Sequence, residues 1–286
     1  MKSRRSRKFI EWALLGSTWL ALPALLLIII FIFLGALPAF ESVGLGALLT
    51  GEEWRPTKEL YGLLPSVLGT LMVTGIALVI VFPVGLGLAL FLTEAAPAWG
   101  ARLIRRALEL LAGIPSVVYG FFGIIVLVPV LRQLFGGSGF SAVTGGVVLA
   151  IMVLPTMVTL SEDALRAVPS EYRAGSLALG ATHWQTVTRV VLPSAIPGIS
   201  AGLVLAMGRA IGETMAMIMV VGNITGMPTS LFGPVRTLTG NIAIEMKYAT
   251  GIHQSTLYAA GVFLLVTIII LNLILNSLFR RREARQ

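Results

Sequence analysis

Long blocks of apolar residues alternate along this chain with short polar segments. Six blocks are long enough, at about 20 helical residues each, to cross the roughly 30 Å hydrocarbon core of a bilayer. The pattern therefore predicts six membrane-spanning helices, over residues 13–39, 65–93, 108–134, 143–160, 196–222 and 257–279. The first block exceeds the 7–15 apolar residues of a cleavable signal peptide, so we expect it to stay as a helix.

The composition agrees with a membrane protein. Hydrophobic residues make up 56% of the chain and charged residues only 12%, whereas soluble domains carry about 25% charged residues. The net charge of +8 does not indicate nucleic-acid binding, because the basic clusters flank apolar blocks, where anionic lipid headgroups attract them. With no cysteine and two distant histidines, we expect no disulfide, no metal site and no bound cofactor. The predicted fold class is all-α integral membrane.

The distribution of positive charge predicts the orientation. The segments 1–11, 94–106, 161–195 and 280–286 together carry 15 Lys and Arg residues, against 5 in the alternate segments and at the end of the third block. Loops on the cytoplasmic side carry the excess of Lys and Arg. We therefore expect a multi-pass protein with both termini in the cytoplasm.

The cytoplasmic segment 161–195 is longer than a connection between spans requires. Its pattern predicts a short amphipathic helix that ends at Gly180 and a second one from Thr182 to Val191, which leads into Leu192 and Pro193. Two short helices separated by glycine form a knob that suits a groove on a partner protein. A loop lying on the membrane surface without a partner is the alternative.

This segment resembles the coupling loop of bacterial ABC-importer permeases, which docks into the ATPase subunit. The likeness rests on the small residues before Gly180 and on the Val-Val-Leu-Pro ending at Pro193. The family pattern opens with a glutamate that is absent here, because Ala174 takes its place and Glu171 lies one turn upstream. The resemblance assigns the docking role to Glu171, Ala174, Gly175, Gly180, Leu192 and Pro193.

Two charged residues, Arg209 and Glu213, lie within the fifth predicted span. A charge at the bilayer centre costs at least about 2.5–3.5 kcal/mol on insertion scales, so such residues face the bundle interior or water. A spacing of four places both on one face of a continuous helix, where they can pair. Arginine also presents a planar fork of donors that matches phosphate oxygens. From the residues alone, a structural ion pair and an anion site are both open.

Residues 209–216, followed by Val221-Gly222-Asn223, resemble a signature of phosphate-specific ABC-importer permeases, and so do residues 113–123. Both are more similar to the C-type than to the A-type subunit. The likeness runs from about residue 65 to the C-terminus and implies a MetI-like permease bundle in the bacterial inner membrane, with inorganic phosphate as substrate. In that family the intramembrane arginine and glutamate act in phosphate movement. They correspond to Arg209 and Glu213, and Ser116, Thr214 and Asn223 are further candidates for hydrogen bonds along the path.

The resemblance also implies an organisation and a set of partners. Residues 1–64 hold a basic tail, the first span and a periplasmic segment, residues 65–279 form the permease core with the coupling loop, and residues 280–286 form a basic tail. The expected partners are a second homologous permease, two ATP-binding cassette ATPase subunits, a periplasmic phosphate-binding protein and membrane lipid.

Catalytic motifs do not occur in the sequence. None of the four lysines follows a glycine, so there is no P-loop, and ATP hydrolysis is expected on another polypeptide. The charged residues Glu94, Glu109 and Glu171 are expected to be solvated or interfacial. Three alternatives remain at this point: a permease for sulfate or molybdate, a secondary anion transporter, and a membrane scaffold. A secondary transporter would typically show internal repeats, which we do not find.

Overall fold

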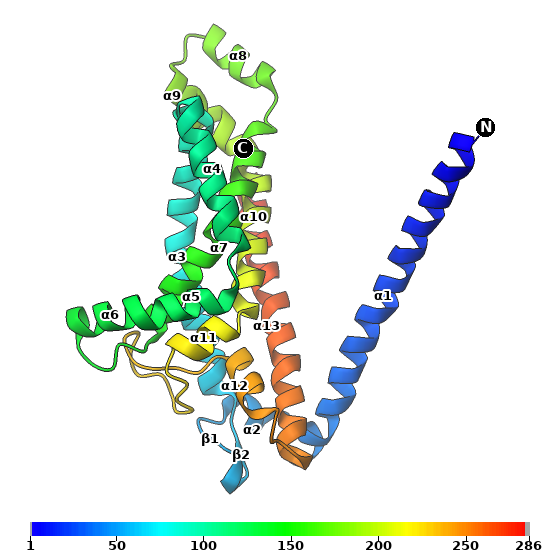
Figure 1. Ribbon diagram of the computed structural model, residues 1–286, viewed down its shortest axis with the longest axis vertical. Helices are drawn as coiled ribbons and strands as arrows, with labels where there is room; N and C mark the ends of the chain where they lie inside the picture. The colour runs from blue at the N-terminus through cyan, green and yellow to red at the C-terminus, as the bar shows by residue number, and fades with distance from the viewer. Residues whose placement is uncertain (1, 284–286) are drawn as a thin grey trace.

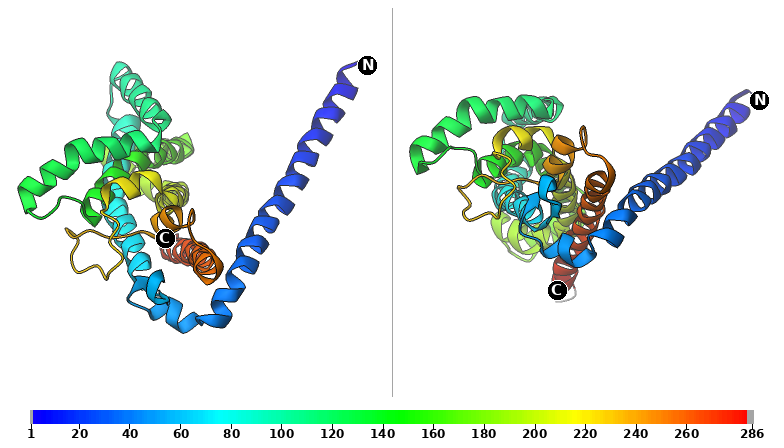
Figure 2. Two further views of the ribbon diagram at one scale, coloured as in Figure 1. Left: turned by 60° about the horizontal axis from the view of Figure 1, so that its bottom comes forward. Right: turned by 90° about the horizontal axis from the view of Figure 1, so that it is seen from below.

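The computed structural model describes residues 2–283 and consists mainly of helices. Four long helices run side by side along the long axis (Figure 1), and they are α3 (Leu64–Glu94), α7 (Ala142–Arg166), α10 (Leu192–Gly212) and α13 (Gly251–Glu283). Helix α1 (Lys2–Ser42) meets α13 near one end and diverges from it toward the other (Figure 2). Within the described residues, six helices are long and apolar enough to cross a membrane, which agrees with the predicted number.

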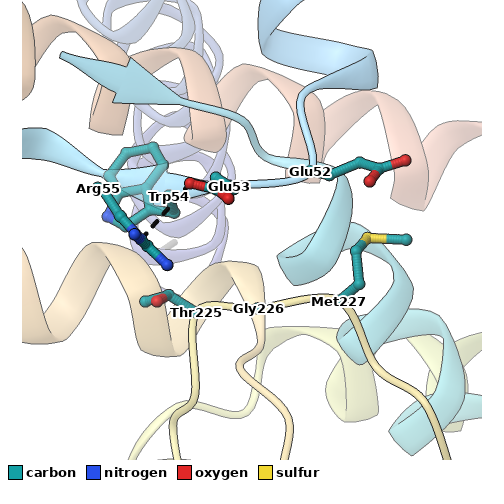
Figure 3. A pocket seen from close by; sticks show the side chains of 7 residues that line it. All are labelled: Glu52, Glu53, Trp54, Arg55, Thr225, Gly226 and Met227. Carbon is teal, nitrogen blue, oxygen red and sulfur yellow. Dashed lines mark ion pairs between the residues drawn. The ribbon is translucent and has the colours of Figure 1, made fainter. Parts of the chain in front are cut away.

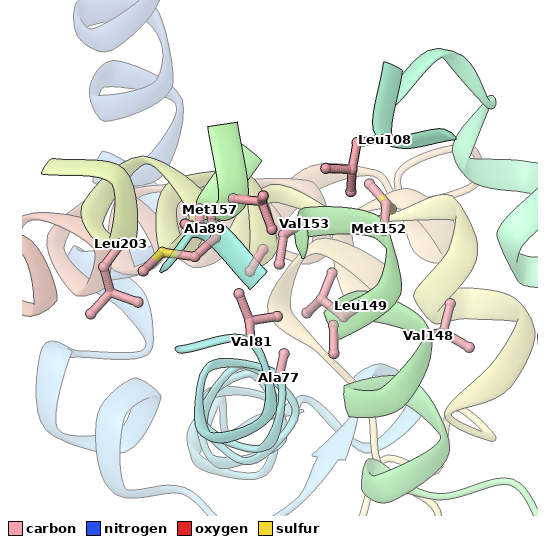
Figure 4. Packing of buried hydrophobic residues seen from close by; sticks show 14 of the residues in the cluster. Ala77, Val81, Ala89, Leu108, Val148, Leu149, Met152, Val153, Met157 and Leu203 are labelled. Carbon is pink, nitrogen blue, oxygen red and sulfur yellow. The ribbon is translucent and has the colours of Figure 1, made fainter. Parts of the chain in front are cut away.

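The hydrophobic core lies between α3, α7 and α10. Buried side chains from these helices and from α4 (Ala98–Gly113) interlock there (Figure 4), among them Ala77, Val81, Val153, Met157 and Leu203. Small residues allow the close approach, because a Cβ on Gly146 would meet the Ile76 side chain at 2.5 Å. Glycine at this position therefore lets α3 and α7 pack closely.

The two ends of the bundle carry different structures. At one end, here called the loop end, lie α8 (Ser170–Ala178) and α9 (His183–Thr186), together with the first turns of α1 and the last turns of α13 (Figure 1). At the other, the hairpin end, lie α2 (Leu45–Thr50), η1 (Pro56–Lys58), α12 (Leu238–Glu245) and a two-stranded antiparallel hairpin, β1 (Trp54–Arg55) and β2 (Leu60–Tyr61). Trp54 pairs with Tyr61 and Arg55 with Leu60. Of the expected basic C-terminal tail, residues 280–283 continue α13, and residues 284–286 lie outside the described residues.

The third predicted span begins later than expected. Residues 108–113 belong to α4, and the chain is extended at Ile114 and Pro115 before α5 (Ser116–Phe122), η2 (Gly123–Leu127) and α6 (Val128–Phe135). Proline disfavours a helical conformation at the preceding residue, so the helix breaks there. The α5–η2–α6 segment runs across the direction of α3 and α7 in both figures.

The fifth predicted span is displaced toward the loop end. Helix α9, the π turn η3 (Val187–Val191) and α10 form one continuous helix from His183 to Gly212, so the expected separate helix over Thr182–Val191 is wrong. A π turn accommodates Pro193, which lacks the N–H of a regular helix. At the other end the helix stops at Gly212, and residues beyond it form the short helix α11 (Met215–Val220). The fourth span also extends further than expected, to Arg166.

Candidate functional site

A cavity of about 830 Å³ opens beside Arg209, between α7, α10 and α13. Its walls are largely apolar, and only three of its side chains are polar. The lining residues are Thr156, Leu160, Ala201, Val204, Leu205, Gly208, Arg209 and Asn272. An apolar cavity with a few convergent polar groups is the usual form of a small-molecule site.

Arg209 is the positive charge of this cavity. It lies in the last turn of α10, where the helix dipole favours a cation, and its side chain is exposed. Its Nη1 donates to Thr156 Oγ1 at 3.4 Å, and no carboxylate among the described side chains lies within ion-pair distance. A Cβ on Gly208 or Gly212 would meet no heavy atom within 4 Å, so the backbone beside Arg209 faces open space. The guanidinium therefore has donors free for an anion.

The ion pair of Arg209 with Glu213, one of the two alternatives that the sequence left open, is not formed in the described structure. An i, i+4 pair requires a continuous helix, but α10 ends at Gly212 and Glu213 has extended backbone angles (φ −68°, ψ 131°). The Glu213 side chain turns to the next helix instead, where Oε1 accepts a hydrogen bond from the Ala216 amide at 3.0 Å. A carboxylate at a helix N-terminus is favoured by the free amides there. Glu213 is buried, and its carbonyl accepts a bond from the Thr239 hydroxyl.

The other predicted path residues are not among those that line this cavity. The hydroxyl of Thr214 donates to the Gly212 carbonyl at 3.2 Å. Asn223 has a left-handed backbone (φ 55°), and its amide donates to the Ile218 carbonyl near the end of α11. Ser116 is the first residue of α5 and is half-buried.

Two polar residues of the cavity were missed by the sequence analysis. Thr156 and Asn272 are polar residues within the apolar spans of α7 and α13, and that isolation is the signal that could have found them. Asn272 makes no side-chain hydrogen bond within the described part of the chain, and its Oδ1 is shielded from solvent without a donor. The amide is thus not committed to a bond that holds helices together.

A second pocket, of about 240 Å³, lies at the hairpin end (Figure 3). Its lining includes Glu52 and Glu53 against a single cation, Arg55, which pairs with Glu53 at 3.5 Å. Figure 3 shows these two side chains facing each other, while Glu52 points away. An excess of carboxylates repels an anion, so Arg209 marks the better anion site.

The predicted coupling loop is an exposed hairpin of helices at the loop end. Helix α8 carries Glu171, Ala174 and Gly175 on its solvent-accessible surface and is followed by Gly180 in a left-handed conformation (φ 85°), as the sequence indicated. The return arm begins with a capping box between Thr182 and Gln185. Leu192 and Pro193, which the resemblance placed in the loop, form the half-buried first turn of α10.

Comparisons with known proteins agree with this architecture. Residues 82–285 match the family described as binding-protein-dependent transport system inner membrane component. A probable ABC transporter permease protein YqgH from Bacillus subtilis is 41% identical over 89% of this chain and 85% of its own length. A phosphate transport system permease protein PstC from Mesorhizobium japonicum is 38% identical over 90% of this chain and 84% of its own.

Solved structures show the same fold. A chain of a bacterial alginate ABC transporter, in complex with an alginate pentasaccharide-bound periplasmic protein, has a TM-score of 0.62 at 18% identity and covers 94% of this chain and 97% of its own. A chain of the inward-facing MetNI methionine ABC transporter has a TM-score of 0.60 at 21% identity and covers 77% of this chain and 95% of its own. The chain therefore belongs to the inner-membrane components of binding-protein-dependent transport systems, the permeases of ABC importers.

Proposed function

We propose that this chain is a membrane permease subunit of an ATP-driven importer of inorganic phosphate and forms one side of the translocation path. The observation that carries the proposal is the Arg209 guanidinium, which faces a cavity inside the membrane-spanning bundle without a carboxylate partner in the described chain. Relatives at 34–38% identity over most of the chain are phosphate transport permeases.

The cavity suits an anion that must be released again. Arginine offers several N–H donors in one plane, which match the oxygens of phosphate. Thr156 and the Asn272 amide add neutral hydrogen-bonding groups on the facing helices. A single fixed charge with neutral neighbours gives a waypoint rather than a tight site, which conduction requires.

The exposure of Arg209 supports a second permease subunit. An arginine that faced lipid at this depth would cost several kcal/mol, so its exposed side faces protein or water in the membrane. A homologous permease covering this face would close the path around the guanidinium. In this proposal Glu213, Thr214, Asn223 and Ser116 belong to the segments that border the path, and Glu213 acts there as the cap of α11.

The remaining partners follow from the two ends of the bundle. Two ATPase subunits would bind the loop end, where α8 and α9 project, and a periplasmic phosphate-binding protein would bind the hairpin end. This orientation places both termini in the cytoplasm. It is supported by the excess of Lys and Arg at the loop end and by the first turns of α1 and the last turns of α13, which lie at that end (Figure 1). The chain itself hydrolyses no ATP in this proposal.

The test is uptake of labelled phosphate by cells whose high-affinity phosphate import depends on this chain. Arg209→Gln removes a charge-assisted hydrogen bond of about 1.5–3 kcal/mol, so we expect uptake to fall by about tenfold to a hundredfold with normal assembly. Arg209→Lys keeps the charge but loses the fork, and should retain intermediate uptake. The matched control is Arg132→Gln, because Arg132 is an exposed arginine at the end of another span.

Two results would contradict the proposal. Normal uptake by an assembled Arg209→Gln complex would reduce the guanidinium to a packing role. The second result concerns the substrate. If wild-type cells take up labelled sulfate or molybdate as well as phosphate, and excess unlabelled phosphate does not suppress that uptake, the substrate is another oxyanion.

A further inference from the structure

The first arm of the coupling loop, α8, is held in place by few apolar contacts, whereas the second arm, α9, continues into the buried residues Val187 and Val191 of η3. None of the nine residues of α8 is buried, and Leu177 and Leu179 are 48% and 91% exposed. A helix without a buried face is positioned by polar contacts or by a partner, because it gains little from burial. One hydroxyl bond joins the arms, between Ser176 and Thr186 at 2.9 Å.

One carboxylate links α8 and α9 to α3, a helix that is not adjacent to them in the chain. Glu94, the last residue of α3, accepts two hydrogen bonds from Arg173 of α8, to Oε2 from Nη1 at 2.9 Å and to Oε1 from Nη2 at 2.8 Å. Its Oε2 also lies 3.4 Å from Nε2 of His183, the first residue of α9. The Glu94 side chain is only 7% exposed and Arg173 is 29% exposed. The Glu94 side chain is therefore shielded rather than solvated, and its place at the membrane interface stays a prediction.

The geometry of this contact is rigid. A guanidinium that binds both oxygens of one carboxylate fixes the orientation of both groups as well as their distance. Shielding from water strengthens the contact and protects it from screening by salt. Glu94 thereby touches the first arm through Arg173 and the second arm through His183.

The elements on either side of Glu94 extend deep into the bundle. Helix α3 packs against α7 along the core, and α7 carries Thr156 of the cavity. The second arm continues without interruption through η3 into α10, which carries Arg209. Movement of the loop can therefore reach the cavity directly along α7 and α10, which precede and follow the loop in the chain, but it reaches α3 at this end through Glu94.

We propose that Glu94 is a positioning residue that fastens both arms of the coupling loop to α3, so that the loop, α3 and α10 move together when the ATPase partner moves the loop. This inference rests on the proposed function as an importer permease. Without the carboxylate, α8 would shift relative to α3, and ATP hydrolysis would move the cavity less per cycle.

The test uses spin labels in the assembled transporter. The chain has no cysteine of its own, so labels on Leu177→Cys in α8 and Ala98→Cys, just beyond the end of α3, report one distance within this chain. Glu94→Gln removes the charge, and Arg173→Lys keeps the charge but loses the fork. The matched control is Glu162→Gln. That carboxylate is 8% exposed and bonds Arg105 and Arg166 at 2.8 Å, but it joins α4 to α7 and has no ion pair with α8 or α9 in the described part of the chain.

We expect a narrow distance distribution in the wild type and in Glu162→Gln, and a broader or shifted one in Glu94→Gln and Arg173→Lys. Coupling between sites typically amounts to a factor of about 5–150. We therefore expect phosphate imported per ATP hydrolysed to fall by roughly tenfold in the two loop variants relative to the wild type and to Glu162→Gln.

An unchanged distance distribution in Glu94→Gln would overturn the inference, as would unchanged import per ATP with a broadened distribution. If Glu94→Gln does not assemble, Arg173→Lys decides by the same criteria. A wild-type complex that imports no phosphate would instead overturn the proposed substrate, and the distance measurement would still decide the role of Glu94.

Discussion

Replacing Glu245 by glutamine tests how the hairpin end of the bundle is held together. Glu245 ends α12 and is buried, and its carboxylate collects contacts from three separate segments. Oε2 accepts a hydrogen bond from Trp54 Nε1 of β1 at 2.8 Å and lies 2.9 Å from His253 Nε2 of α13. Oε1 accepts from Arg236, which is 11% exposed. The carboxylate thus joins the hairpin, the segment before α12 and the sixth span.

The size of the effect can be worked from these contacts. Glutamine has only one carbonyl oxygen. If this oxygen faces Trp54 and His253, the NH2 group faces the donors of Arg236; if it faces Arg236, the NH2 group faces the Trp54 N–H. Removing one partner of a fully buried ion pair costs about 3–5 kcal/mol. Arg236 retains two acceptors, Asn241 Oδ1 at 2.9 Å and the Asn223 carbonyl at 3.1 Å. The expected cost is therefore closer to one charge-assisted hydrogen bond, about 2–3 kcal/mol.

Thermal unfolding of the detergent-solubilised protein, followed by tryptophan fluorescence, measures this loss. At about 2–4 °C per kcal/mol for a chain of this size, Glu245→Gln should lower Tm by about 5–10 °C. The control is Glu53→Gln in the same region, because Glu53 and Arg55 are both more than half exposed and such pairs contribute about 0–1 kcal/mol. Equal Tm values for the two variants would refute the reasoning that the buried carboxylate joins the three segments.

Three further predictions follow from single positions. Gly62→Ala should lower the free energy of unfolding by about 1–3 kcal/mol in the same assay, because the added Cβ would overlap the Gly51 carbonyl. The control is Gly46→Ala in α2, where an added Cβ meets nothing within 4 Å and the change should be neutral or stabilising. Burial raises the pKa of the Tyr61 hydroxyl above 10.0. Since the folded state holds this proton more tightly, the wild type loses stability as pH rises above 10, and Tyr61→Phe should lose less in an alkaline titration. Asn272→Leu should slow phosphate uptake while leaving Tm unchanged or higher, because the amide has no partner in the described chain; a lower Tm would indicate a structural role instead.

The spans were predictable from the sequence because hydrocarbon thickness sets their length, but their ends depended on local chemistry. The second predicted span, residues 65–93, nearly coincides with α3 (Leu64–Glu94) because a proline marks its start and a glutamate its end. The third was placed too early because the apolar stretch continues through the break at Pro115, which hydropathy alone does not register. The buried role of Glu94 could not be predicted, since its partner Arg173 lies 79 residues away and local sequence carries no sign of that contact.

The failed pairing of Arg209 and Glu213 has the largest consequence for function. The spacing of four residues suggested a pair because nothing in the apolar pattern marked a helix end at Gly212. An ion pair with Glu213 would have explained how Arg209 is tolerated in the membrane but not what it does there. In the structure Glu213 caps α11, and Arg209 is left with a single neutral hydrogen-bond partner, Thr156, beside an open cavity. A permanently charged group in an apolar span needs a counter-charge or water. The described chain supplies no carboxylate there, and water alone would explain how the arginine is tolerated but not what it does, so we propose a mobile anion as its partner.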